Sequence, residues 1–191
     1  MDLASAALVG IFLGISLAAP PGPVTAIIVN RASRSVFGAV TVGFGAMSAD
    51  FVLMVLVIAL GSGAELSPYD KYIYLSGSVV FFLMAMMIAS SGSKMKETGE
   101  RSSGYLSGLL VGIVNPFQII WWFTAGLGFY EKFNIYPFIF LFVGTTAWVV
   151  FLSYLIRYSV IRFGEKIREI TTGFSVITLV AFGIYFILLI L

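Results

Sequence analysis

Residues 3–30 read LASAALVGIFLGISLAAPPGPVTAIIVN, an uncharged run of 28 residues with three prolines in its second half. A helix needs about 20 apolar residues to cross the hydrocarbon core of a membrane, so this run is long enough. Pro20, Pro21 and Pro23 enclose Gly22, and each proline removes a backbone donor and clashes with the preceding helical turn. An unbroken helix is therefore not expected, and the run predicts two half-helices that meet inside the membrane.

Five more long runs follow, and only one of them contains a charge, Asp50. They are 35–64, 72–93, 102–130, 133–156 and 170–191. The chain of 191 residues is 60% hydrophobic and 10% charged, whereas a soluble domain carries about 25% charged residues. The sequence predicts an all-α polytopic membrane protein with six transmembrane helices, which leaves no room for a soluble catalytic domain.

The missing residue types exclude several kinds of site. The chain has no Cys and no His, so disulfides, thiolate metal sites and catalytic triads that use His or Cys are impossible. A membrane enzyme of another type needs a second acid, a Ser–Lys pair or metal ligands at membrane depth, and none is present. The net charge of +2 is too small to indicate nucleic acid. We expect no enzyme, no cofactor, no metal and no nucleic-acid partner.

The basic residues fall mostly on one side if all six runs span the membrane. The first, third and fifth connections carry nine of them: Arg31, Arg34, Lys94, Lys96, Arg101, Arg157, Arg162, Lys166 and Arg168. Only Lys71 and Lys132 fall on the other side. Because cytoplasmic loops are enriched in Lys and Arg, both termini are predicted to lie outside the plasma (inner) membrane.

The polar segment 91–103, SGSKMKETGERSS, divides the chain into two parts of nearly equal length. Residues 1–90 and 104–191 each hold three of the apolar runs. Because three is an odd number, the second part must enter the membrane from the opposite side. The sequence predicts one transmembrane domain built as a 3+3 inverted repeat, with 91–103 as a cytoplasmic linker.

A second break is predicted at Asn115-Pro116 in the fourth run, which corresponds to the first run of the other half. Paired interruptions are the best sequence pointer to a transporter's binding site, although Asn115-Pro116 alone is equally consistent with an ordinary kink. The half-helix N-termini offer free N–H groups to an anion such as a carboxylate. Glycines that suit close packing, inside the chain or in a homodimer, precede both breaks: Gly10, Gly14, Gly104, Gly108 and Gly112.

Asp50 is the one charged residue far from the end of an apolar run. A charge at membrane depth costs at least about 2.5 to 3.5 kcal/mol, so Asp50 must face the interior of the bundle. There it can carry a proton or balance a substrate ammonium or a cation. The alternative is a neutral Asp that bonds to a neighbouring helix. Gly38, Gly43 and Gly45 precede it and allow close packing against a broken helix.

Weaker candidates are uncharged. Thr25 and Gln118 follow the two breaks, and Trp148 in the fifth run either stacks on a substrate or simply packs. Other polar side chains serve equally well as hydrogen-bond partners between helices: Asn30, Thr124, Thr145 and Thr146. The Phe-rich tracts 138–142 and 182–186 are expected to face lipid, and the sixth run is expected at the periphery.

The run 20–50, PPGPVTAIIVNRASRSVFGAVTVGFGAMSAD, resembles the opening signature of the LysE/RhtB family of amino-acid exporters, with a Pro-Gly-Pro, spaced glycines and an Asp in that order. The run 108–123, GLLVGIVNPFQIIWWF, is similar to the family's Gly-rich approach to an Asn-Pro. Ala49 replaces a frequent Gly, and Phe117-Gln118 replaces a frequent Lys-Ala. The resemblance implies export of amino acids coupled to an ion gradient, and a central site formed by Gly22, Pro23, Asp50, Asn115 and Pro116.

These observations predict a secondary transporter that exports amino acids or related small solutes, coupled to the proton gradient through Asp50. One alternative is a cation or metal-ion exporter, which the wider superfamily also contains, with hard ligands from Asp50, Asn115 and backbone carbonyls. Another is a passive channel, which would need polar or charged residues along several helices, whereas the apolar runs offer one acid and scattered hydroxyls. The predicted substrate-binding residues are Pro20, Pro21, Gly22, Pro23, Thr25, Asp50, Asn115, Pro116, Gln118 and Trp148.

Overall fold

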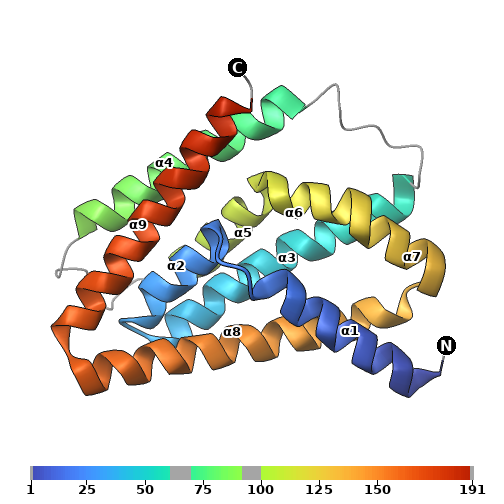
Figure 1. Ribbon diagram of the computed structural model, residues 1–191, viewed down its shortest axis with the longest axis horizontal. Coiled ribbons are helices and arrows are strands. Elements are labelled where there is room, and N and C mark those ends of the chain that lie inside the picture. The colour runs from blue at the N-terminus through green and yellow to red at the C-terminus, as the bar shows by residue number, and fades with distance from the viewer. Residues whose placement is uncertain (1, 61–69, 92–99, 190–191) are drawn as a thin grey trace.

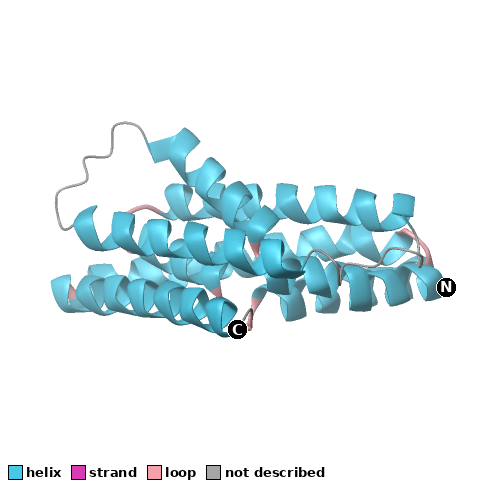
Figure 2. Ribbon diagram, turned by 90° about the horizontal axis from the view of Figure 1, so that it is seen from above, coloured by secondary structure: helices cyan, strands magenta, loops and turns pink. Residues whose placement is uncertain are grey.

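The computed structural model describes residues 2–60, 70–91 and 100–189, and these fold into helices joined by short turns, with no strand among them (Figures 1 and 2). The predicted all-α class is confirmed. Most of the linker 91–103 lies outside the described residues. The helices are α1 (Leu3–Ala18), α2 (Pro23–Ala32), α3 (Val36–Leu60), α4 (Asp70–Ser91), α5 (Glu100–Val114), α6 (Pro116–Trp121), the π-helical segment Trp122–Gly126, α7 (Leu127–Phe133), α8 (Tyr136–Phe163) and α9 (Glu165–Leu188).

Several of these helices are long and apolar enough to cross a membrane. Within the described residues α3, α8 and α9 qualify singly, and the bent pair α1 and α2 qualifies together. The apolar parts of α4 (Tyr74–Ala89) and α5 (Gly104–Val114) are shorter. A multi-pass membrane protein is confirmed, while the count of six spans stays a prediction.

The first predicted break is present between α1 and α2, whose axes differ in direction by 82°. Gly22 is extended and precedes Pro23, the first residue of α2. Proline suits that position because the first N–H of a helix has no helical acceptor and the proline ring presets the backbone. The hydroxyl of Thr25 donates to the carbonyl of Pro20 at 3.2 Å and so ties α2 back to the break.

The second predicted break is also present, between α5 and α6. Asn115 has an extended backbone (φ −76°, ψ 108°), and its side-chain oxygen accepts from the N–H of Phe117. Pro116 again occupies the first helical position. The π-helical segment after α6 adds a further irregular turn, and such segments are frequent at functional sites. Both breaks therefore produce a helix start inside an apolar part of the chain.

Two pairs of helices pack closely enough to require glycine, and the contacts recur at a fixed spacing. A Cβ at Gly14 of α1 would collide with the carbonyl of Leu141 in α8, and a Cβ at Gly108 of α5 would collide with the carbonyl of Val42 in α3. The two glycines are 94 positions apart, and their two partners are 99 apart. The pair α1–α8 and the pair α5–α3 thus meet in the same way.

The reverse contacts follow the same rule. A Cβ at Gly144 of α8 would meet the carbonyl of Ile11, and a Cβ at Gly45 of α3 would meet the carbonyl of Tyr105. The spacings are again 99 between the glycines and 94 between their partners. Small residues at such crossings let helix backbones approach in a membrane, where apolar burial alone does not drive association. The glycine faces predicted from the sequence are therefore occupied within the chain.

The expectation that the Phe-rich tracts face lipid is wrong for two of their aromatic residues. Phe138 and Phe186 are fully buried. Helix α9 lies beside α4 (Figure 1) and also packs on α2, where the hydroxyl of Ser175 donates to the carbonyl of Ala26 at 2.6 Å. Helices α4 and α9 lie together at the edge of the structure (Figure 1), as expected for the sixth run, and one face of α9 covers the short half-helix α2.

We predict that Gly108→Ala destabilises the protein by about 1 to 3 kcal/mol, the usual cost of overpacking, because the new Cβ would force α5 away from α3. Gly173→Ala is the matched control, since a Cβ at Gly173 of α9 meets nothing within 4 Å. Thermal unfolding of the purified protein in detergent compares the two. Equal stability of both variants would contradict the close crossing.

Candidate functional site

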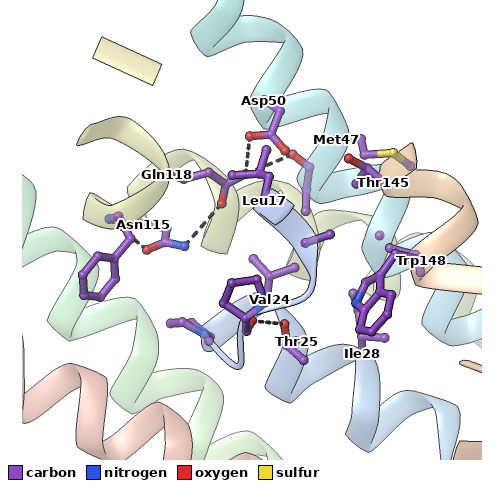
Figure 3. Close-up of a pocket in the computed structure, with 18 of the residues that line it drawn as sticks. Leu17, Val24, Thr25, Ile28, Met47, Asp50, Asn115, Gln118, Thr145 and Trp148 are labelled. Carbon is purple, nitrogen blue, oxygen red and sulfur yellow. Dashed lines mark hydrogen bonds between the residues drawn. The ribbon is translucent and has the colours of Figure 1, made fainter. Parts of the chain in front are cut away.

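A cavity of about 400 Å³ lies where the two breaks face α3 and α8 (Figure 3). The predicted site residues that line it are Pro20, Pro21, Gly22, Pro23, Thr25, Asp50, Asn115, Gln118 and Trp148. Pro116 is the exception, because it is fully buried as the first residue of α6 and does not face the cavity. Residues from distant parts of the sequence thus meet in one place.

Asp50 is buried, with 4% of its surface exposed, and it accepts two hydrogen bonds. Both go to the same oxygen, Oδ1: the amide Nε2 of Gln118 and the indole Nε1 of Trp122 each donate at 2.8 Å. Within the described residues no ion pair reaches Asp50, and its Oδ2 carries no hydrogen bond. The carboxyl group is held by neutral donors, with one oxygen left for a partner in the cavity.

Gln118 connects Asp50 to the second break. The amide Nδ2 of Asn115 donates to Oε1 of Gln118 at 3.3 Å, and Gln118 donates onward to Asp50. A hydrogen-bonded chain of this kind fixes the orientation of each amide. The irregular backbone at Asn115 therefore sets the position of the acid.

Trp122 is the partner of Asp50 that the sequence did not reveal. It is 1% exposed and bonded to Asp50. The available signal was its place four residues after Gln118, which puts both side chains on one face of a helical turn. Apolar lining residues such as Leu17, Ile28 and Phe182 carried no signal, because they look the same as residues that face lipid.

The start of α2 forms another wall of the cavity. Gly22 has no side-chain cap, and a Cβ there would meet nothing within 4 Å, so the space before the helix is open. The N–H groups of Val24 and Thr25 find no acceptor among the described residues, as expected in the first turn of a helix. They and the helix dipole favour an anion at this wall.

Trp148 faces the cavity from α8, with its indole opposite the start of α2 (Figure 3). Its Nε1 is buried and has no acceptor among the described residues. A buried donor without a partner costs about 1 to 3 kcal/mol, so an acceptor bound in the cavity would be favourable here.

The remaining polar candidates divide into two groups. Thr145 lines the cavity and donates to the carbonyl of Gly14 at 3.3 Å. Asn30 donates to Thr172 of α9 at 3.4 Å, and Thr146 donates to the sulfur of Met47 in α3 at 3.4 Å, so both join helices and neither lines this cavity. The side chain of Thr124 lies outside the described residues.

The family described as LysE type translocator matches residues 15–189, which include both breaks and Asp50. The chain belongs to this family. The resemblance seen in the sequence motifs is confirmed, and a translocator is a transporter rather than an enzyme. The chain is also 27% identical, over 92% of each chain, to a Bacillus subtilis (strain 168) protein named "Putative amino acid efflux protein YcgF". No solved structure gives a significant match.

A double-mutant cycle tests the bond between Trp122 and Asp50 in this LysE family member. At alkaline pH, where Asp50 is ionised, Trp122→Phe is expected to lower the free energy of unfolding by about 1.5 to 3 kcal/mol, in addition to the effect of the lost ring volume. In the Asp50→Asn background the acceptor is neutral, and the corresponding loss is expected to be about 0.5 to 1.5 kcal/mol. The loss of ring volume is the same in both backgrounds and cancels. Unfolding in detergent, followed by circular dichroism, gives the coupling free energy. Strictly additive effects would show that the indole gains nothing from the charge of Asp50 and would contradict a bond to an ionised carboxylate.

Proposed function

We propose that the chain exports amino acids or related small solutes from the cytoplasm, and that the cavity between the two breaks is the binding site. The observation that carries the proposal is Asp50, a buried acid with one oxygen free of bonds to described residues, in a cavity that also holds an open helix start. The name of the Bacillus subtilis relative supports amino acids as the substrate class.

The cavity offers one partner for each charged group of an amino acid. Oδ2 of Asp50 suits the ammonium, and the N–H groups at the start of α2 suit the carboxylate. Pairing matters because an isolated charge in an apolar medium is costly. The zwitterion and the site therefore neutralise each other's charges.

We further propose that export is coupled to protons by competition at Asp50. A bare carboxylate at membrane depth costs at least about 2.5 to 3.5 kcal/mol, so the carrier reorients only when Asp50 holds a proton or an ammonium. With substrate bound, the protein changes from an inward-facing to an outward-facing state and releases the substrate. Without substrate, it changes back with a proton bound to Asp50. Each cycle then exchanges one bound proton for one substrate.

The proposed topology has two repeats, 1–90 and 104–191, and places the basic connections together at the cytoplasmic end. The matching spacings of the glycine contacts support the repeat. Arg157 donates to the carbonyl of Ser33 at 3.0 Å, and Gly104 lies against Gly38, so the residues next to the first, third and fifth connections share one end.

Single cysteines test this orientation cleanly, because the chain has none of its own. Lys132→Cys, in the last turn of α7, is expected to react with a membrane-impermeant maleimide in intact cells. Lys166→Cys, at the start of α9, is expected to react only after the cells are opened. The reverse pattern would place the termini in the cytoplasm and contradict the proposal.

Asp50→Asn tests the coupling. The carbonyl oxygen of Asn accepts the same bonds from Gln118 and Trp122, so the variant is expected to fold, yet it takes up no proton and balances no ammonium. In proteoliposomes loaded with amino acids, a pH gradient is expected to drive efflux in the wild type and to have at least about 100-fold less effect in the variant, since the lost pairing is worth about 3 kcal/mol or more.

Asp2→Asn is the control for that experiment, because Asp2 is exposed and caps α1 by accepting from the N–H of Ser5. It is expected to transport as the wild type does. Unchanged pH-driven efflux in Asp50→Asn would refute coupling through this residue.

A thermal-shift screen of amino acids against divalent cations separates the proposal from a cation exporter, since stabilisation by divalent cations alone would favour the latter. Within the described residues no group of three or more Asp and Glu could hold a metal ion.

A further inference from the structure

We infer that this site selects neutral amino acids with apolar side chains, and that the Nε1 of Trp148 is a donor to their carboxylate. The inference deepens the proposed export function and rests on it. It follows from the charges, the donors and the apolar surfaces that the described residues bring to the cavity.

Charge is the first argument. Asp50 is the one charged side chain among the described residues that line the cavity. The ammonium common to all amino acids uses it, through Oδ2. A lysine or arginine substrate would bring a second cation into a site with no second acid, and a buried unpaired charge is strongly disfavoured. An acidic substrate would bring a second anion, and no Lys or Arg among the described residues lines the cavity.

The apolar surface is the second argument. Most of the lining beyond the polar residues is aliphatic or aromatic, and it comes from α1, α2, α3, α8 and α9: Leu17, Ile28, Met47, Val149, Leu152 and Phe182. A volume of about 400 Å³ lies in the ordinary range for small-molecule sites. An aliphatic side chain placed here would gain contacts and would leave no polar group unpaired.

The orphan donor of Trp148 is the third argument. Its Nε1 has no acceptor among the described residues although it is buried, and the indole stands across the cavity from Thr25 at the start of α2 (Figure 3). Buried donors are nearly always bonded, so an unbonded one beside a cavity needs an explanation. A carboxylate between the indole and the start of α2 would accept from both once the indole turns its buried Nε1 toward the cavity. This arrangement gives the substrate a direction, with its ammonium toward Asp50.

Two substrates that differ in one charge provide the main test, and it needs no variant. Norleucine has the aliphatic chain of lysine without the terminal amine. In counterflow with wild-type proteoliposomes, norleucine and leucine are expected to exchange at least about 100-fold faster than lysine, given the cost of the unpaired charge. Equal exchange of lysine would overturn the selectivity while leaving amino-acid export intact. Exchange of none of the three would instead refute the proposed function.

Trp148→Phe tests the donor. It is expected to lower the exchange of leucine about 10-fold or more and to affect leucinamide much less, because a hydrogen bond to a charged acceptor is the stronger one. Trp121→Phe is the matched control, since Trp121 also lines the cavity but has other interactions, and it is expected to change both substrates by the same factor. If Trp148→Phe lowers the exchange of leucine and of leucinamide by the same factor, the indole packs against the substrate and is not the donor to its carboxylate.

A gain of function tests the charge argument directly. Val149 is a buried residue of the apolar wall, 99 positions after Asp50. Val149→Asp supplies a second acid and is expected to raise the exchange of lysine relative to norleucine at least 10-fold, by roughly the strength of a paired charge. Val149→Asn has nearly the same shape without the charge and is expected to leave the ratio unchanged. A ratio that responds equally to both variants would contradict control by charge.

Discussion

The structure depends on how one carboxyl group is held inside an apolar bundle. Asp50 lies in the middle of α3 among buried apolar residues of the same helix, and it is bonded only by neutral donors. Two donors on one oxygen orient the group without cancelling its charge, and the second oxygen is open to the cavity. A full ion pair with Lys or Arg would have removed the need for a mobile partner. The two neutral donors fix the carboxyl group of Asp50, and its second oxygen stays available to a proton or a substrate ammonium in the proposed cycle.

The two breaks supply those donors and the cavity in front of them. After the second break, Gln118 and Trp122 point at Asp50 from successive turns, and Asn115 at the break holds Gln118. After the first break, the start of α2 faces the same cavity with unbonded N–H groups. Irregular backbone at membrane depth is tolerated where it lines such a cavity, so the breaks and the cavity require each other.

The glycine crossings explain why these parts meet. The α3–α5 crossing brings the second break beside Asp50, and the α1–α8 crossing brings the first break beside Trp148. Because both crossings have the same spacing of contacts, one packing solution is used twice. The acid, however, occurs once: the residue 99 positions after Asp50 is the apolar Val149. The same packing is thus repeated around a site that is not repeated, and the proposed amino-acid substrate would therefore bind in a single orientation.

The sequence by itself determined the class of structure, the two breaks and the burial of Asp50, because proline and charge act through local rules that hold wherever the chain goes. Of the ten residues that the sequence predicted for the site, nine line the cavity. Only the tertiary structure decided that Trp122 and Gln118 share one oxygen of Asp50, that Pro116 is buried away from the cavity, and that Phe138 and Phe186 are core residues. In a chain this apolar, the apolar side chains that face lipid, core and cavity are of the same types. Hydrophobic pattern therefore carries no information about which face is which, and the packing of helix on helix supplies it.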